Sequence, residues 1–338
     1  MNTKVLAPTP EALREASELL RHGALVAFPT ETVYGLGADA LNAEAVLRIF
    51  EAKNRPADNP LIVHIWDKSQ LDGLCVPNET ALRLMDAFWP GPLTLLCPKK
   101  PAVPDVVTAG LPTVGMRMPS HPVAQAMLRV SGVPVAAPSA NRSTRPSPTT
   151  AQHVLEDMDG RIPLILDGGP CDFGVESTVL DVSGKVPVIF RPGAVTKEMV
   201  AGVVGACEVA DSVMRPLAEG ESAPSPGMKH RHYAPKGKLT IFRGEAERVA
   251  EAILQVYPES GRPVILALTP HLDRYVGKET LDMGESLLDA AHNLFACLRE
   301  ADELGYDRLL AEAVSEEDVG LAVMNRLARA AAFDVVDV

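Results

Sequence analysis

The sequence predicts an α/β protein of two domains, and three features support this fold class. Amphipathic stretches typical of helices and short apolar stretches typical of strands follow one another along the whole chain. A length of 338 residues suits two domains of roughly 100–200 residues each. Residues 208–237 carry closely spaced prolines and glycines that interrupt any period, as in a linker. We therefore expect domains over 1–207 and 238–338, joined by 208–237.

The first domain mixes helices and strands without strict alternation, which favours a mixed sheet over a purely doubly wound one. Because several connections are short or rich in glycine, we expect antiparallel neighbours among its strands. The pattern predicts helices over 10–22, 43–52, 78–88 and 121–130 and from 149, and strands over 24–28, 61–66, 93–96, 114–118, 135–137, 163–166, 177–182 and 186–190.

The second domain alternates regularly between strand and helix, which predicts a small parallel α/β domain. It contains no G-x-G-x-x-G, so no dinucleotide is assigned to it. The predicted strands are 238–243, 263–269, 279–283 and 306–314, and the predicted helices are 245–256, 285–304 and 320–332.

Charge and composition exclude several classes of protein. The net charge is −12, and residues 238–338 hold 10 Lys and Arg against 19 Asp and Glu, so this part is poorly suited to binding a phosphate backbone. No apolar run reaches the roughly 18 residues of a membrane span, and the first residues lack a secretory pattern. Five scattered cysteines argue against a disulfide framework or a structural zinc site and suit a reducing cytoplasm.

The segment K-N-R-P-A-D-N-P-L-I-V-H, residues 53–64, is the first candidate for chemistry. Pro56 prevents the preceding helix from continuing, so Lys53, Arg55 and the amide of Asn59 lie on a tight loop that enters a strand. Loops held by rigid elements are where binding groups concentrate. A solvated connection with incidental charges is the alternative interpretation.

Two further segments carry polar groups beside strands. In P-T-E-T-V-Y-G-L-G, Gly35 and Gly37 permit a close backbone approach, although a plain structural turn explains them more simply. In T-V-G-M-R-M-P, Arg117 lies in an otherwise apolar strand and requires an anionic partner. Glu31, another internal carboxylate or the carboxylate of a substrate would serve.

The segment A-P-S-A-N follows a strand of very small side chains, which leaves room for a ligand beside Ser139 and Asn141. An Asx-type turn is the alternative. E-S-T-V and F-R-P-G place Ser177 and Arg191 at strand ends, where both are further candidates for binding. The alternative interpretation is that each is merely a residue at the rim of the sheet. Together the cations of these motifs would offset much of the roughly −4 charge of a nucleoside triphosphate and a carboxylate. They are Lys53, Arg55, Arg117 and Arg191.

Other chemistries lack their motifs. The sequence has no G-x-x-x-x-G-K-[ST] phosphate loop and no G-x-S-x-G nucleophile elbow. His230 and His232 stand only two residues apart in the linker and are interpreted as surface groups, so no protein metal site is expected. The aromatic residues are too dispersed to form a stacking platform for single-stranded RNA.

In this order the motifs resemble the YrdC-like family, whose K-x-R … S-x-N signature falls here on Lys53, Arg55, Ser139 and Asn141. G-M-R-M-P, P-S-P-T-T-A, G-V-E-S-T-V and R-P-G follow in the order expected for the family, and the linker and α/β tail resemble its long, two-domain form. Two positions depart from the pattern: Asn54 stands where many members have glycine, and Ala137 where some carry a hydroxyl residue.

The resemblance implies a YrdC-like open mixed, twisted sheet with helices, followed by a small Rossmann-like parallel domain. It implies synthesis of L-threonylcarbamoyladenylate from L-threonine, bicarbonate or CO2 and ATP, with release of pyrophosphate. This is the first step of N6-threonylcarbamoyladenosine formation next to the tRNA anticodon. Mg2+ would arrive with ATP, a separate tRNA threonylcarbamoyl transferase would use the product, and direct tRNA binding would be weak or absent.

The same resemblance implies roles for individual residues. Lys53 is expected on the phosphates, Arg117 on the threonine carboxylate, and Tyr233 with its linker as a lid. The residues expected to bind ATP are Arg55, Asn59, Thr113, Ser139, Ser147, Arg191 and Tyr233, and those expected to bind L-threonine are Thr32, His64, Arg117 and Ser177.

Two other functions stay open at this point. One is a carbamoyltransferase of the same fold that uses carbamoyl phosphate, although related maturation proteins carry further acylphosphatase or zinc-bearing parts that have no counterpart here. The other is a non-catalytic RNA-binding module, which the acidic tail disfavours.

Overall fold

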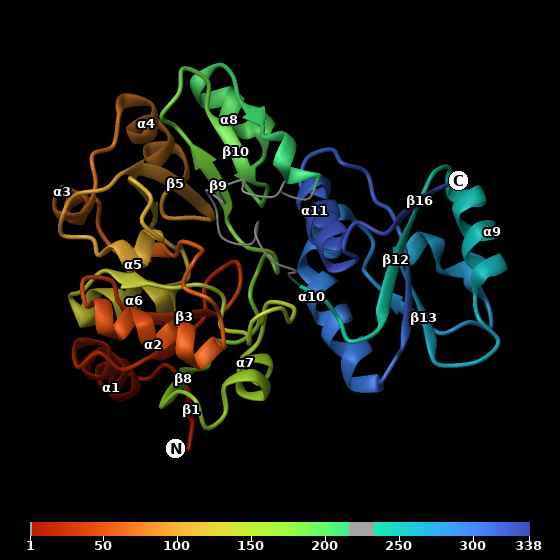
Figure 1. Cartoon of the computed structure of the whole chain (residues 1–338), viewed down its shortest axis with the longest axis horizontal. Helices are drawn as coiled ribbons and strands as arrows, with labels where there is room; N and C mark the ends of the chain where they lie inside the picture. Colours follow the sequence, from red (N-terminus) through yellow and green to blue (C-terminus); the bar gives the residue numbers. More distant parts are fainter. Residues whose placement is uncertain (1, 216–232) are drawn as a thin grey trace.

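The computed structural model describes residues 2–215 and 233–338, which form two sheets with their helices. Figure 1 shows two bodies side by side, with helices α10 (Leu287–Leu304) and α11 (Gly320–Ala330) of the second body facing the first. No helix among the described residues combines the length and the apolar character needed to cross a bilayer.

The first body is built on an 11-stranded mixed sheet of order β1-β8-β2-β3-β7-β4-β6-β5-β9-β10-β11. It contains parallel pairs such as β4–β6 and antiparallel pairs such as β5–β6, which confirms the predicted mixed sheet. The strands are β1 (Lys4–Leu6), β2 (Val26–Phe28), β3 (Gly35–Asp39), β4 (Ile62–His64), β5 (Leu93–Pro98), β6 (Thr113–Arg117), β7 (Val135–Ala136), β8 (Leu164–Leu166), β9 (Thr178–Asp181), β10 (Val188–Arg191) and β11 (Glu208–Val209).

Helices cover both faces of this sheet. Val26 and Phe28 of β2 pack with α1 and α6, whereas Ala27 between them belongs to the core formed with α2 and α4. This alternation is the two-residue period of a strand buried on both faces. The helices are α1 (Pro10–Arg21), α2 (Ala43–Lys53), α3 (Leu71–Leu74), α4 (Glu79–Phe88), α5 (Asp105–Thr108), α6 (Pro122–Ser131), α7 (Ala151–Met158) and α8 (Lys197–Val204), with short 3-10 turns at Lys68–Gln70 and Asp211–Val213.

Strand β3 corrects the sequence interpretation of Gly35 and Gly37, which favoured a plain turn. Both glycines lie within the sheet, paired with β2. A Cβ atom at Gly37 would lie 2.7 Å from Val135 Cγ1 and 2.9 Å from Phe28 Cε1. Glycine is therefore needed here because neighbouring side chains occupy the space above the backbone, and not because the chain reverses.

The second body contains a five-stranded sheet of order β14-β13-β15-β12-β16, in which every pair is parallel. This confirms the predicted parallel α/β architecture, and the short edge strand β16 is an addition to the predicted elements. The strands are β12 (Lys238–Arg243), β13 (Pro263–Ala267), β14 (Thr280–Asp282), β15 (Arg308–Glu312) and β16 (Val335–Asp337), and α9 (Ala246–Val256), α10, α11 and a 3-10 turn at Thr269–Tyr275 complete the body.

The two bodies meet through buried arginines on α10 and α11. Arg299 Nη2 lies 2.7 Å from Asp157 Oδ2 and donates to the carbonyl oxygen of Pro146. Arg326 Nε lies 3.0 Å from Glu176 Oε2. Because all four charged side chains are buried, loss of either arginine would take a cation away from a buried carboxylate, with Arg145 still in contact with Asp157 Oδ1. The ion pairs therefore hold the second body in one position against the first.

Candidate active site

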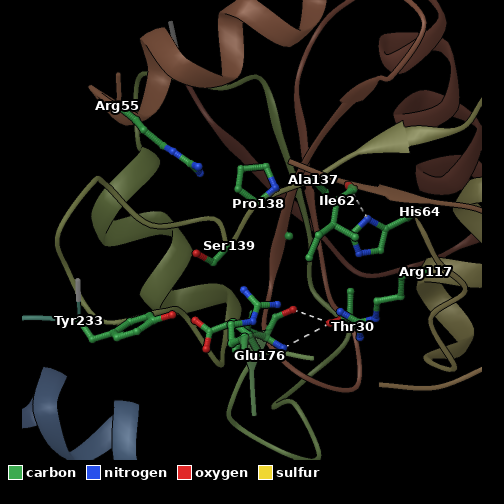
Figure 2. A pocket seen from close by; sticks show the side chains of 13 residues that line it. Thr30, Arg55, Ile62, His64, Arg117, Ala137, Pro138, Ser139, Glu176 and Tyr233 are labelled. Carbon is green, nitrogen blue, oxygen red and sulfur yellow. Dashed lines mark hydrogen bonds between the residues drawn. The ribbon is translucent and has the colours of Figure 1, made fainter. Parts of the chain in front are cut away.

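A pocket in the first body gathers side chains from segments that are far apart in the sequence. Figure 2 shows Arg55 and Tyr233 on one side of it, His64 and Arg117 on the other, and Ser139 between them. Six of the predicted site residues line it: Arg55, His64, Arg117, Ser139, Arg191 and Tyr233. The lining residues are Thr30, Val33, Gly35, Arg55, Ile62, His64, Arg117, Ala137, Pro138, Ser139, Glu176, Arg191 and Tyr233.

One end of the pocket is built around Arg117, the last residue of β6. Its Nη2 lies 2.8 Å from Glu31 Oε1 and donates to Thr32 Oγ1 at 2.9 Å. Of the alternatives for its anionic partner, the internal carboxylate Glu31 is present. Arg117 also lines the pocket, and its Nε has no hydrogen-bond partner among the described residues. A further anion at this end would therefore meet a guanidinium that Glu31 and Thr32 already orient.

His64 lies beside Arg117, because parallel pairing of β4 with β6 places the two residues in register. Burial, reinforced by the charge of Arg117, lowers the pKa of His64 to about 3. Its imidazole is consequently neutral at physiological pH, with Nδ1 3.2 Å from the carbonyl oxygen of Ile62. A neutral ring can accept or donate one hydrogen bond towards a ligand without adding charge.

Arg191 and Ser177 come together where β9 and β10 pair. Arg191 donates from Nε to the Ser177 carbonyl oxygen at 3.0 Å and from Nη2 to Ser177 Oγ at 3.1 Å. Ser177 Oγ is also 2.8 Å from Thr94 Oγ1. Burial lowers the pKa of Arg191 to about 10, which leaves it cationic at neutral pH. Arg191 lines the pocket, whereas Ser177 lies behind it and fixes its orientation.

The loop after α2 supplies Arg55 and Asn59. Asn54 ends α2 in the left-handed region at φ 51°, a conformation that asparagine tolerates. Arg55 Nη2 donates to the Asn59 carbonyl oxygen at 3.0 Å. The amide of Asn59 is fully buried, and neither Nδ2 nor Oδ1 has a partner among the described residues. A buried amide without partners is costly in a folded protein, so a polar ligand would stabilise it.

Thr113 is the one predicted ATP residue that stands at the start of a strand. It pairs with Pro98 of β5. It lies at the other end of β6 from Arg117 and does not line the pocket.

Lys53 makes contacts that differ from the phosphate contact predicted for it. Its ammonium is buried and donates to the carbonyl oxygens of Ser139 and Asn141, both at 2.5 Å. Asn141 Nδ2 donates in turn to the carbonyl oxygens of Arg142 and Arg145, both at 2.8 Å. Lys53 and Asn141 thus hold the 139–145 loop by hydrogen bonds to its carbonyl oxygens, while Ser139 itself lines the pocket.

Ser147 and Tyr233 complete the predicted ATP residues. Ser147 Oγ donates to Glu176 Oε1, and Glu176 lines the pocket. Tyr233 also lines it, and its ring packs on Phe295 of α10 with 5.0 Å between centroids. Residues 216–232 lie outside the described residues. The predicted lid, 208–237, includes all of them, so the lid and the interpretation of His230 and His232 stay predictions.

Glu176 is the charged residue of the pocket lining that sequence reasoning missed. It stands in the same E-S-T-V segment as the predicted Ser177. The available signal was an acidic residue inside a cluster of motifs that otherwise supply cations. An isolated carboxylate there would oppose anion binding, which already implies that Glu176 has a partner of its own.

Comparisons with known proteins agree along the whole chain. The Sua5/YciO/YrdC family model, described as telomere recombination, matches residues 18–193, and a model described as the threonylcarbamoyl-AMP synthase C-terminal domain matches residues 195–332. Threonylcarbamoyl-AMP synthase of Bacillus subtilis is 48% identical over 99% of this chain and 97% of its own. That of Pyrococcus abyssi is 46% identical over 96% of each chain.

Solved structures give the same result. The crystal structure of P. abyssi Sua5 complexed with L-threonine superimposes with a TM-score of 0.89 at 44% identity and covers 96% of both chains. The structure of a P. abyssi Sua5 variant with two alanine substitutions superimposes with a TM-score of 0.91 at 42% identity, covering 99% of this chain and 98% of that one. The chain therefore belongs to the Sua5/YciO/YrdC family, in its long two-domain form, the threonylcarbamoyl-AMP synthases.

Proposed function

We propose that this protein makes L-threonylcarbamoyladenylate from L-threonine, bicarbonate or CO2 and ATP, with release of pyrophosphate. One observation carries the proposal: a single pocket is lined by Arg117 at one end and by Arg55 and Arg191 elsewhere. Arg117 can therefore neutralise a carboxylate while Arg55 and Arg191 neutralise a triphosphate beside it. Full-length similarity to threonylcarbamoyl-AMP synthases, one of them crystallised with L-threonine, supports the choice of substrates.

In the proposed reaction the amino group of threonine first adds to CO2, giving a carbamate and releasing a proton. A carbamate oxygen then attacks the α-phosphorus of ATP, and the bond from that phosphorus to the oxygen bridging to the β-phosphorus breaks as pyrophosphate leaves. The steps need little acid–base chemistry from side chains. Catalysis would rest on holding the two substrates in line and on neutralising the phosphate charge.

The geometry suggests how the residues share this work. Arg117, held by Glu31 and Thr32, would take the threonine carboxylate, with His64 beside it. Arg55, Arg191 and Ser139 would bind ATP. Asn59 and Ser147 are further ATP candidates, and the contacts of Lys53 support an indirect role through the Ser139 loop.

Mg2+ would be held mainly by phosphate oxygens and water, as is usual for nucleotide sites. The pocket carboxylate Glu176 already accepts a hydrogen bond from Ser147 and pairs with Arg326. The chemistry supplied by the ion is charge neutralisation on the triphosphate.

We also propose that the protein acts in the cytoplasm and passes its product to a separate tRNA threonylcarbamoyl transferase. A mixed anhydride of this kind hydrolyses readily, so an enzyme that consumes it promptly is required. We expect little direct affinity for tRNA, because the second body is acidic.

The test is pyrophosphate release from the purified full-length protein with ATP, Mg2+ and bicarbonate. Release should require L-threonine, D-threonine should not replace it, and mass spectrometry should identify threonylcarbamoyladenylate. Release that is independent of threonine, or activity only with carbamoyl phosphate, would refute the proposal and favour the carbamoyltransferase alternative.

A further inference from the structure

Glu176 is a carboxylate inside a pocket suited to anions. It is only 6% exposed, and its Oε1 accepts the hydrogen bond from Ser147 Oγ while its Oε2 lies 3.0 Å from Arg326 Nε. Burial opposes ionisation, but Arg326 and then Arg191 outweigh it, so the pKa of Glu176 lies below its usual range. The pocket therefore contains a fixed negative charge near Arg191, one of the cations expected to bind ATP.

The partner of this charge comes from the second body. Arg326 is fully buried on α11, and its guanidinium contacts three acceptors of the first body besides Oδ1 of its neighbour Asn325. Besides Glu176 Oε2, it donates from Nη1 to the Pro192 carbonyl oxygen at 2.6 Å and from Nη2 to the Glu176 carbonyl oxygen at 3.3 Å. A planar fork of this kind holds several acceptors in a fixed arrangement, which a lysine cannot do. One side chain thus connects the E-S-T-V and R-P-G segments.

Neighbouring side chains hold α11 in the position that this contact requires. Asn325 Nδ2 donates to the Val213 carbonyl oxygen at 2.5 Å, and Arg329 Nη2 donates to that of Ser212 at 3.1 Å. Both acceptors belong to the segment that follows the first sheet. The position of Arg326 is consequently set by how the second body docks.

Removing Arg326 would have two electrostatic consequences. The carboxylate of Glu176 would lose its closest cation and would either repel the triphosphate or draw Arg191 towards itself. Ser147, which donates to the same carboxylate, would lose a fixed acceptor. Both effects fall on groups expected to bind ATP, and neither falls on the Arg117 end of the pocket.

We propose that Arg326 is a positioning residue for the ATP part of the site, acting through Glu176 on Ser147 and Arg191. Arg326 itself is fully buried and does not line the pocket. The second body thereby completes the electrostatics of a pocket that lies in the first. The inference rests on the proposed function only in taking ATP as the nucleotide.

The experiment is isothermal titration of the full-length protein with α,β-methylene-ATP and Mg2+, and separately with L-threonine, so that no turnover is needed. Arg326→Met should weaken nucleotide binding by about tenfold and leave threonine affinity within about twofold. Adding Glu176→Gln to Arg326→Met should restore most of the nucleotide affinity, because the uncompensated charge is gone while glutamine still accepts from Ser147.

His292→Ala is the matched control, since His292 Nδ1 contacts the Asp172 carbonyl oxygen between the same two bodies without touching Glu176. It should bind both ligands as the wild type does. If near-ultraviolet circular dichroism shows that Arg326→Met is unfolded, Arg326→Lys is titrated instead, with a smaller selective loss expected.

Equal nucleotide affinity in wild type and the Arg326 variant would overturn the inference. So would an equal loss for both ligands, or a double variant no better than Arg326→Met. A wild type that binds nucleotide without threonine-dependent pyrophosphate release would refute the proposed function and leave this inference standing.

Discussion

Replacing Arg117 by methionine tests the threonine end of the pocket most directly. The Arg117 side chain is 5% exposed and Glu31 is 2% exposed, so the ion pair between them is almost completely removed from water. Methionine keeps most of the side-chain volume and removes the charge. Any loss of binding then reports on the guanidinium and not on a large cavity.

The expected magnitude follows from this burial. Truncating one partner of a buried, hydrogen-bonded charge pair costs about 2–5 kcal/mol of binding free energy, and a loss of about 3 kcal/mol corresponds to roughly 150-fold weaker threonine binding. Nucleotide affinity should stay within about threefold, because Arg55 and Arg191 are retained. The protein should also lose about 3–5 kcal/mol of stability, because Glu31 is left buried without its cation.

The double variant Arg117→Met/Glu31→Gln separates the two effects. It removes the uncompensated carboxylate, so stability should recover while threonine binding remains weak. The assay is isothermal titration of L-threonine and α,β-methylene-ATP into wild type and both variants, with thermal unfolding followed by circular dichroism. A folded double variant that binds threonine within about threefold of wild type would remove Arg117 from the carboxylate site.

Three further predictions concern buried groups around the pocket and between the bodies. Because the pKa of His64 is about 3 in the folded protein and about 6.5 in an unfolded chain, its contribution to stability is lost as pH falls from about 6.5 towards 3, at up to about 1.4 kcal/mol per pH unit. The free energy of denaturant unfolding should therefore depend less steeply on pH in His64→Gln than in the wild type between about pH 4.5 and 6.5. An equal slope in the two proteins would contradict a neutral buried ring. Lys53→Met should leave the carbonyl oxygens of Ser139 and Asn141 without their donor, which lowers stability by about 1–3 kcal/mol for each. Nucleotide binding should weaken more than threonine binding. Unchanged affinity for both ligands in calorimetry would show that Lys53 does not support the 139–145 loop. Arg299→Met should destabilise the protein by less than the ~3–5 kcal/mol expected for an uncompensated buried charge, because Arg145 still pairs with Asp157. In thermal unfolding, Asp157→Asn should cost less in this background than in the wild type, and additive losses in the double variant would show that Arg299 and Asp157 are not coupled.

The fold class of both bodies could be predicted from the residues alone, because hydrophobic period and loop length are local properties. Regular alternation with crossover helices permits only a parallel arrangement for residues 238–338, and this is what the second sheet shows. The residue types of the candidate site were also visible. Arginines in apolar strands require anionic partners wherever the strands are placed.

Tertiary structure decided which partner each group has. Nothing local to Gly37 shows that Val135 and Phe28 occupy the space a Cβ would need. Nothing local to Lys53 shows that its ammonium reaches carbonyls 86 and 88 residues away. Burial and distance depend on the packing of remote segments, so charges that are plain in the sequence acquire roles only when the chain is folded.

The pairing of Glu176 with Arg326 is the extreme case, since 150 residues separate the two and they lie in different bodies. In the sequence, Glu176 is an acid among cations and Arg326 is one charge on an amphipathic helix. Only docking of the two sheets brings them within 3.0 Å, where burial of both side chains strengthens the contact.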